Sequence, residues 1–154
     1  MLFRSYSHVD KAFYVGQSNK QYFIKNGLHN NQLIYAPHSI DNKRFYDVDS
    51  TYETKAKIWR EKLMIPSSAV VFLFAGKLEP KKNPLLLIHA YKYLNRPDVF
   101  LIIAGNGVLE KSLKKESESN PNIIFIDFQN QQIMPVVYRL GDIFILPSKG
   151  PGET

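Results

Sequence analysis

Apolar runs alternate with helical patterns from residue 69 onward. The runs are continuous rather than interrupted at every second position, which is typical of parallel strands covered on both faces. We expect strands at Val70–Ala75, Val99–Ala104, Ile123–Asp127 and Asp142–Leu146, separated by helices at Pro84–Leu94, Val108–Glu118 and Pro135–Leu140. This order predicts an α/β fold with a doubly wound, Rossmann-like parallel sheet.

The first 65 residues follow a less regular pattern. The elements expected here are a strand at Ala12–Val15, a helix at Asn19–Asn26 between the cap Ser18 and the terminator Gly27, and a strand at Gln32–Tyr35. Residues 37–49 read as a polar loop. Ser50 and Glu53 have the spacing of a capping box, which predicts that a helix starts there. Its apolar face would consist of Tyr52, Ala56, Trp59 and Leu63.

Charge is distributed unevenly along the chain, whose net charge is +6. Residues 1–84 carry 13 Lys and Arg against 7 Asp and Glu, whereas residues 85–154 carry 7 against 7. A nucleic-acid-binding protein would place its motifs on a basic stripe with interleaved aromatic residues. The candidate motifs described below cluster toward the neutral half, so we expect no nucleic-acid partner.

Composition favours a cytoplasmic protein. The chain has no cysteine, which removes disulfides and thiolate chemistry. Its first residues lack the apolar core of a signal peptide, and the longest apolar run, Ala69–Ala75, is far shorter than a membrane span.

A glycine and two lysines follow the first buried strand. Gly76 ends the strand, Lys77 comes next, and Lys82 precedes Asn83-Pro84, a typical helix start. In an open α/β sheet the carboxyl ends of the strands form the ligand crevice, and a helix amino terminus favours anions. The pattern indicates a ligand that carries phosphate, although surface lysines on an ordinary loop would give the same sequence.

Two further groups occupy equivalent positions at later strand ends. Gly105-Asn106-Gly107 follows the second strand, and its glycines would let backbone amides approach a ligand. The third glycine of a dinucleotide fingerprint is replaced by Glu110, which argues against a dinucleotide site. Glu153 follows the last strand, where a carboxylate would suit hydrogen bonds from sugar hydroxyls, although an ordinary loop residue or a charge at a helix amino terminus would give the same sequence.

Metal binding finds little support in the sequence. Asp47-Val48-Asp49 has the form of a metal-binding Asp-x-Asp signature, but it lies in a polar loop rather than at a strand end. The four histidines show no ligand spacing. We therefore expect neither a metal nor a cofactor.

Taken in order, the motifs resemble the carboxy-terminal domain of retaining GT-B glycosyltransferases of family four, the glycosyl transferases group 1. The segments that carry the resemblance are APHSIDNKRF, GKLEPKKNP, LIIAGNG, NIIFIDF and YRLGDIFILPSKGPGET. The chain departs from the family pattern at His38 and Ser39, which replace Asn-Gly, and at Asp127, which replaces a frequent glycine.

The resemblance implies roles for individual residues. Lys77 and Lys82 would contact the diphosphate of a nucleotide sugar, and Glu153 would reach the donor sugar as the first of two glutamates. The donor-binding residues would be Gly76, Gly105, Gly107, Asp127, Phe128 and Gln129, with the last three beside the nucleobase. Positive charge from the lysines would stabilise the leaving diphosphate without a metal.

The resemblance also implies a domain division. Residues 1–45 would be the end of an amino-terminal acceptor domain with its linker, and residues 46–154 a donor-binding domain. Both would be incomplete, and the acceptor is unknown. Peripheral membrane contact would then depend on the amino-terminal domain. Two alternatives stay open at this point: a nucleotide- or phosphate-binding module without catalytic activity, and a nucleotide-sugar epimerase of the same architecture.

Overall fold

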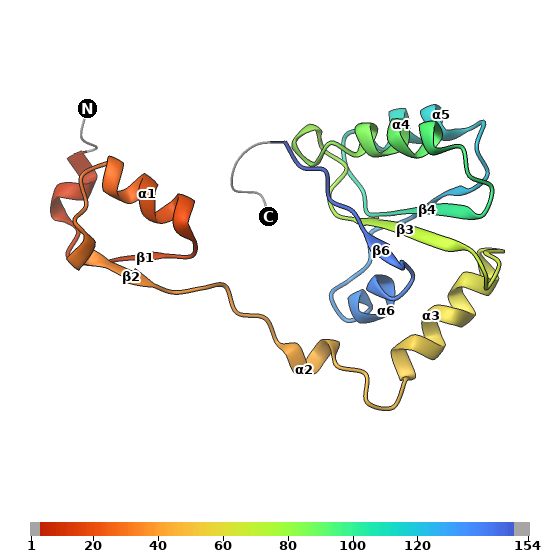
Figure 1. Ribbon diagram of the computed structural model, residues 1–154, viewed down its shortest axis with the longest axis horizontal. Coiled ribbons are helices and arrows are strands. Elements are labelled where there is room, and N and C mark those ends of the chain that lie inside the picture. Colours follow the sequence, from red (N-terminus) through yellow and green to blue (C-terminus); the bar gives the residue numbers. More distant parts are fainter. Residues whose placement is uncertain (1–3, 150–154) are drawn as a thin grey trace. The chain divides into compact units, whose positions relative to one another are not determined.

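The computed structural model describes residues 4–149 (Figure 1). The chain forms two compact units, which meet in the sequence between Asn42 and Lys43. This junction lies close to the predicted division at residue 45, but the assignment of the first segment to an acceptor domain stays a prediction. Each unit is described by itself below.

The first unit contains one small parallel β–α–β motif. Strand β1 (Ala12–Tyr14) pairs in parallel with β2 (Leu33–Tyr35), and α1 (Gln17–Lys25) connects them. Two short 3-10 helices, η1 (Arg4–His8) and η2 (Asn30–Gln32), complete this part. The predicted elements are thus present, but the cap Ser18 is wrong because the helix begins earlier, with Gly16 at the N-cap position.

A four-stranded parallel sheet forms the second unit. Its strands are β3 (Val70–Ala75), β4 (Val99–Ala104), β5 (Ile123–Ile126) and β6 (Ile143–Phe144), and their order is β5-β4-β3-β6. Strands β4 and β5 are added on one side of β3, whereas β6 pairs with β3 on its other side. The order of strands therefore reverses at β3, and ligands of doubly wound sheets bind at such a switch point.

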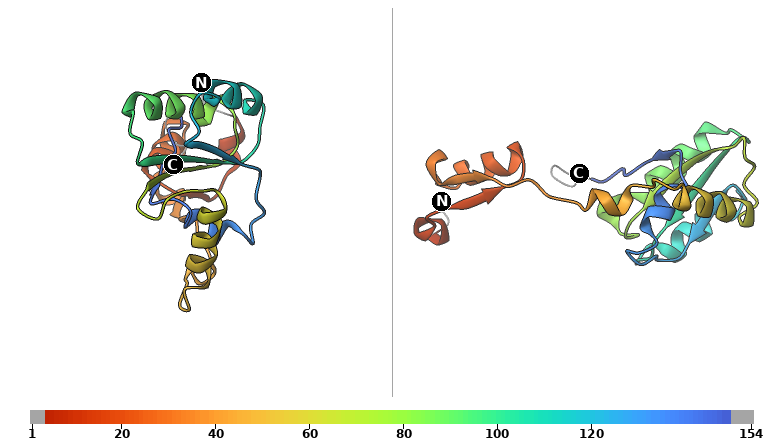
Figure 2. Two further views of the ribbon diagram at one scale, coloured as in Figure 1. Left: turned by 90° about the vertical axis from the view of Figure 1, so that its right-hand side faces the viewer. Right: turned by 90° about the horizontal axis from the view of Figure 1, so that it is seen from below.

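Helices cover both faces of this sheet, which confirms the predicted fold class (Figure 1; Figure 2 gives two further views). On one face α3 (Thr51–Lys62) and α6 (Met134–Tyr138) pack on a cluster that includes Ala56, Leu73, Ile102, Val137 and Leu140. On the other face α4 (Pro84–Leu94) and α5 (Glu110–Ser117) contribute Ile88 and Leu113 to a cluster with Phe74 and Ile103 of the sheet. Tyr52, Trp59 and Leu63 pack on the first cluster beside Ala56, so the predicted apolar face of α3 is confirmed.

The start of α3 differs from the sequence prediction. Ser50 has a left-handed backbone, with φ of 54°, and its side chain makes no capping hydrogen bond. Asp47 takes this role, because its carboxylate accepts hydrogen bonds from the amides of Tyr52 and Glu53 at 3.0 and 2.8 Å. The predicted capping box is therefore wrong, although the helix that it predicts is present.

Other differences concern the ends of elements. The segment predicted as a polar loop contains a short helix, α2 (Asn42–Phe45), and α5 and α6 are shorter than predicted. A 3-10 helix, η3 (Pro80–Lys82), precedes α4. Strand β6 is reduced to Ile143 and Phe144, each about half exposed, because within residues 4–149 it pairs only with β3.

Candidate functional site

A pocket of about 250 Å³ lies at the carboxyl edge of the sheet. Three strand ends and the helix that follows β5 form its wall. The lining residues are Ala75, Gly76 and Lys77 after β3, Ala104, Gly105 and Asn106 after β4, and Phe128, Gln129, Gln131, Met134 and Tyr138 after β5. The pocket thus lies at the carboxyl ends of the strands, where open α/β sheets bind ligands, and it extends from β3 toward β5.

Backbone contacts hold the ends of β3, β4 and β5 together. The amide of Gly76 donates to the carbonyl of Ala104, and the amide of Gly105 donates to the carbonyl of Ile126, both at 3.0 Å. Gly105 has a φ of +142°, and a Cβ atom built on it would lie 2.0 Å from the carbonyl oxygen of Gly76. Only glycine allows the two backbones to come this close.

The second glycine of the predicted pair has a similar packing role. A Cβ on Gly107 would lie 2.5 Å from the carbonyl oxygen of Leu78, which itself accepts a hydrogen bond from the amide of Leu109 at 3.0 Å. Gly107 is not among the residues that line the pocket. The structure therefore gives it a packing role between loops, and its predicted role in donor binding stays a prediction.

The two predicted lysines occupy different places. Lys77 lines the pocket, and among the lining residues within the described part of the chain it is the only charged one. Lys82 ends η3 and does not line the pocket. The segment after β6 approaches η3, because the amide of Lys149 donates to the carbonyl of Lys81 at 2.7 Å. Glu153 follows that segment and lies outside the described residues.

Only part of the segment that is predicted to lie beside the nucleobase lines the pocket. Phe128 and Gln129 line the pocket, whereas Asp127 is exposed and does not. The Gln129 side chain donates to the carbonyl of Asp127 at 3.0 Å, which turns the loop back on itself. The Asn130 side chain accepts hydrogen bonds from the amides of Gln132 and Ile133 and so leads the chain into α6.

Six lining residues were not predicted as site residues from the sequence: Ala75, Ala104, Asn106, Gln131, Met134 and Tyr138. Tyr138 lies between two other rings, with centroid distances of 6.0 Å to Phe45 and 5.6 Å to Phe144. Such edge and tilted ring contacts favour one orientation of the phenol. The sequence does contain one signal that pairs two of them: Met134 and Tyr138 lie four positions apart and therefore share one face of a helix.

The pocket has the chemistry of a site for an elongated, partly polar ligand. One ammonium group lies at the β3 end, amide side chains line the β4 and β5 ends, and aromatic and apolar groups complete the wall. Within residues 4–149 no group of three or more histidine or acidic side chains is arranged to hold a metal ion. No helix in the same part of the chain is long and apolar enough to cross a membrane.

Residues 55–153 match the family described as glycosyl transferases group 1. The chain is 29% identical over 129 residues to a UDP-Gal:alpha-D-GlcNAc-diphosphoundecaprenol alpha-1,3-galactosyltransferase of Escherichia coli; the match covers 79% of the chain and 32% of that protein. It is 28% identical over 149 residues to a GDP-mannose-dependent monoacylated alpha-(1-6)-phosphatidylinositol monomannoside mannosyltransferase of Corynebacterium glutamicum, covering 95% of the chain and 38% of that protein.

Solved structures share the fold. The crystal structure of Anabaena Alr3699/HepE in complex with UDP superposes with a TM-score of 0.78 at 17% identity, covering 92% of this chain and 39% of that one. At this identity the likeness concerns the fold alone. The chain thus spans between 32% and 39% of the length of these three proteins.

Proposed function

We propose, because the chain belongs to the glycosyl transferases group 1 family, that its second unit binds the nucleotide-diphosphate sugar of a retaining glycosyltransferase. One observation carries the proposal: the pocket joins the ammonium of Lys77 at the end of β3 to aromatic and amide groups after β5. A nucleotide sugar has the same division of chemistry, with charge on its phosphates and a flat, hydrogen-bonding base at one end.

The order of the strands gives the ligand a direction. Neighbouring strands lie about 4.8 Å apart, so the ends of β3 and β5, with β4 between them, are separated by about 10 Å. One nucleoside with its phosphates covers this length. The diphosphate would lie at Lys77, and the base would lie against Phe128 and Gln129.

Electrostatic stabilisation is the proposed chemical contribution of this unit. Negative charge grows on the leaving diphosphate as the bond to the sugar breaks, and a fixed positive group at that position lowers the barrier. Lys77, which lines the pocket, would supply this group. Lys82 directly precedes Asn83, the N-cap residue of α4, so its charge and the helix amino terminus occupy neighbouring positions. Glu153 keeps its proposed role at the donor sugar.

The names of similar proteins suggest which donors to test. The galactosyltransferase of Escherichia coli is named for UDP-Gal, the mannosyltransferase of Corynebacterium glutamicum for GDP-mannose, and the Anabaena structure contains UDP. The chain covers only a fraction of the length of these proteins. We therefore also propose, for the whole protein, that it transfers the sugar to an acceptor and that any contact with a membrane is made by the whole protein.

Calorimetric titration of the chain with UDP, GDP, ADP and inorganic phosphate tests the proposal. We expect a nucleoside diphosphate to bind more tightly than phosphate alone. Replacing Lys77 by alanine removes a charge-assisted hydrogen bond, which is worth about 1.5–3 kcal/mol, or roughly a tenfold to hundredfold loss of affinity. Lys57→Ala is the matched control, because Lys57 is 69% exposed on α3 and pairs with Glu53. Absence of binding by all three nucleotides, or equal affinity of Lys77→Ala and the parent chain, would contradict the proposal.

A further inference from the structure

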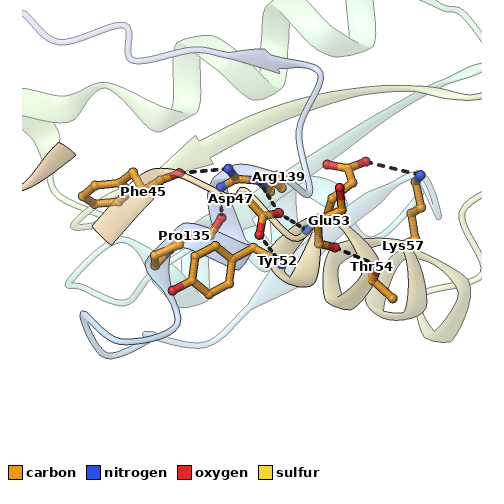
Figure 3. A network of polar contacts seen from close by, with 9 residues as sticks. Phe45, Asp47, Tyr52, Glu53, Thr54, Lys57, Pro135 and Arg139 are labelled. Atoms are coloured by element: carbon orange, nitrogen blue, oxygen red, sulfur yellow. Dashed lines mark hydrogen bonds and ion pairs between the residues drawn. The ribbon is translucent and has the colours of Figure 1, made fainter. Parts of the chain in front are cut away.

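Arg139, at the end of α6, holds together three segments of the second unit (Figure 3). Its guanidinium donates one hydrogen bond to the carbonyl of Pro135 within α6 and another to the carbonyl of Phe45 in α2, both at 2.9 Å. Its Nε lies 3.5 Å from the carboxylate of Asp47, and the group stands 5.6 Å from the centre of the Tyr52 ring. One side chain thus contacts α2, the turn before α3, and α6.

The carboxylate that faces Arg139 is held firmly as well. The side chain of Asp47 is only 8% exposed and accepts hydrogen bonds from the amides of Tyr52 and Glu53. Burial acts to raise its pKa, but these two hydrogen bonds and the charge of Arg139 outweigh that effect and hold the pKa below its ordinary value of 3.8. Asp47 is therefore an anion that both caps α3 and fixes the guanidinium.

The segment fixed in this way contacts the wall of the donor pocket. The guanidinium of Arg44 lies 3.3 Å from the side-chain oxygen of Gln131, and the Phe45 ring packs at 6.0 Å against Tyr138. Gln131 and Tyr138 both line the pocket. Two consecutive residues of α2 therefore contact two residues that line the pocket.

We infer that Arg139 is a positioning residue of the donor pocket, and that docking of α2 on α6 and occupancy of the pocket are coupled. The inference rests on the proposed function. With Arg139 in place, α2 is held on α6, and the wall that Tyr138 and Gln131 present to the nucleotide is set before the ligand arrives. Coupling of this kind is reciprocal, so a bound nucleotide also holds α2 in place. Because α2 lies where the chain enters the second unit, a bound nucleotide changes how firmly the segment that joins the two units is held.

Two measurements on the whole 154-residue chain test the inference. The first is the dissociation constant of UDP for Arg139→Gln, which we expect to rise at least about fivefold, the lower end of typical coupling between sites. The second is trypsin cleavage after Lys43 and Arg44, followed by mass spectrometry with and without UDP. We expect UDP to slow this cleavage in the parent chain and to have little effect on it in Arg139→Gln. Arg96→Gln is the control of equal charge, since Arg96 is exposed and pairs only with Asp98 among the described ion pairs.

A second variant keeps the test independent of the folding of Arg139→Gln. Phe45→Ala removes the ring from Tyr138 and leaves Arg139 and Asp47 intact, so it should also weaken UDP binding and the protection by UDP. Parent-like affinity in both variants, or cleavage in the parent chain that UDP does not slow, overturns the inference while the proposed function stands. Failure of the parent chain to bind UDP, GDP or ADP overturns the proposed function and the inference with it.

Discussion

Replacing Gly105 by alanine should destabilise the second unit through a contact between two backbones. The added Cβ would lie 2.0 Å from the carbonyl oxygen of Gly76 and 3.1 Å from its carbonyl carbon. Both atoms are backbone, so no side chain can rotate away to make room. The φ of +142° adds a second cost, because side chains of L residues rarely accept that conformation.

The expected loss can be estimated from these two contributions. A residue held in an unfavourable backbone region costs about 1–3 kcal/mol. Overpacking by one methyl group costs typically about 1–3 kcal/mol more. The sum, about 2–6 kcal/mol, is a large share of the stability of an ordinary domain, which is about 5–15 kcal/mol. Displacement of the Gly76 carbonyl would relieve the clash but would deform the pocket, so nucleotide affinity should fall as well.

Urea denaturation followed by tryptophan fluorescence measures this loss directly. Trp59, the only tryptophan of the chain, packs on the core of the second unit and reports its unfolding. With a slope of about 2 kcal/mol per molar urea, a loss of about 4 kcal/mol lowers the midpoint by about 2 M. Gly76→Ala is the matched control, because its added Cβ would meet neighbours only at 3.8–4.0 Å. If the two variants unfold at the same urea concentration, the close approach of the backbones is refuted as the reason for glycine at position 105.

Two further predictions concern carboxylates. The folded state holds the pKa of Asp47 below 3.8, so Asp47 stabilises the fold above that pH and loses this contribution as the pH falls through its folded pKa. Asp47→Asn should therefore be less stable than the parent at pH 7 in urea denaturation and should approach it in acid; a difference that is the same at pH 7 and in strong acid contradicts this. Asp142→Ala removes the acceptor for the buried amide of Val71, at 2.7 Å, and the partner of Arg60. We expect a loss of about 1–3 kcal/mol in thermal melting, and an unchanged melting temperature contradicts it.

The sequence was most informative where a single local signal decides the structure. Strands β3 and β4 and helix α4 have the predicted bounds, Val70–Ala75, Val99–Ala104 and Pro84–Leu94. A continuous apolar run fits a parallel strand that is covered on both faces, and β4 is indeed buried at every position. The predicted family is confirmed too, because residues 55–153 match the glycosyl transferases group 1.

Prediction failed where two local signals compete and a distant residue decides. Both Ser50 and Asp47 are good helix caps, and the spacing from Ser50 to Glu53 favoured Ser50. The structure uses Asp47, whose carboxylate also faces the guanidinium of Arg139. A cap that gains a charge partner from another helix is favoured over one that does not, and no pattern within residues 47–53 contains that information.

The glycines of the candidate site show why residue type alone cannot separate a role in folding from a role in binding. Gly105 and Gly107 were interpreted as places where a ligand approaches the backbone, yet in the structure the neighbour that approaches is the loop after β3. The two roles are compatible at Gly105, because the same close contact brings its backbone into the wall of the pocket beside Lys77. They separate at Gly107, which packs against Leu78 outside the pocket wall. Nucleotide binding should therefore be affected directly by a side chain at position 105, and at position 107 only through the fold of the loop.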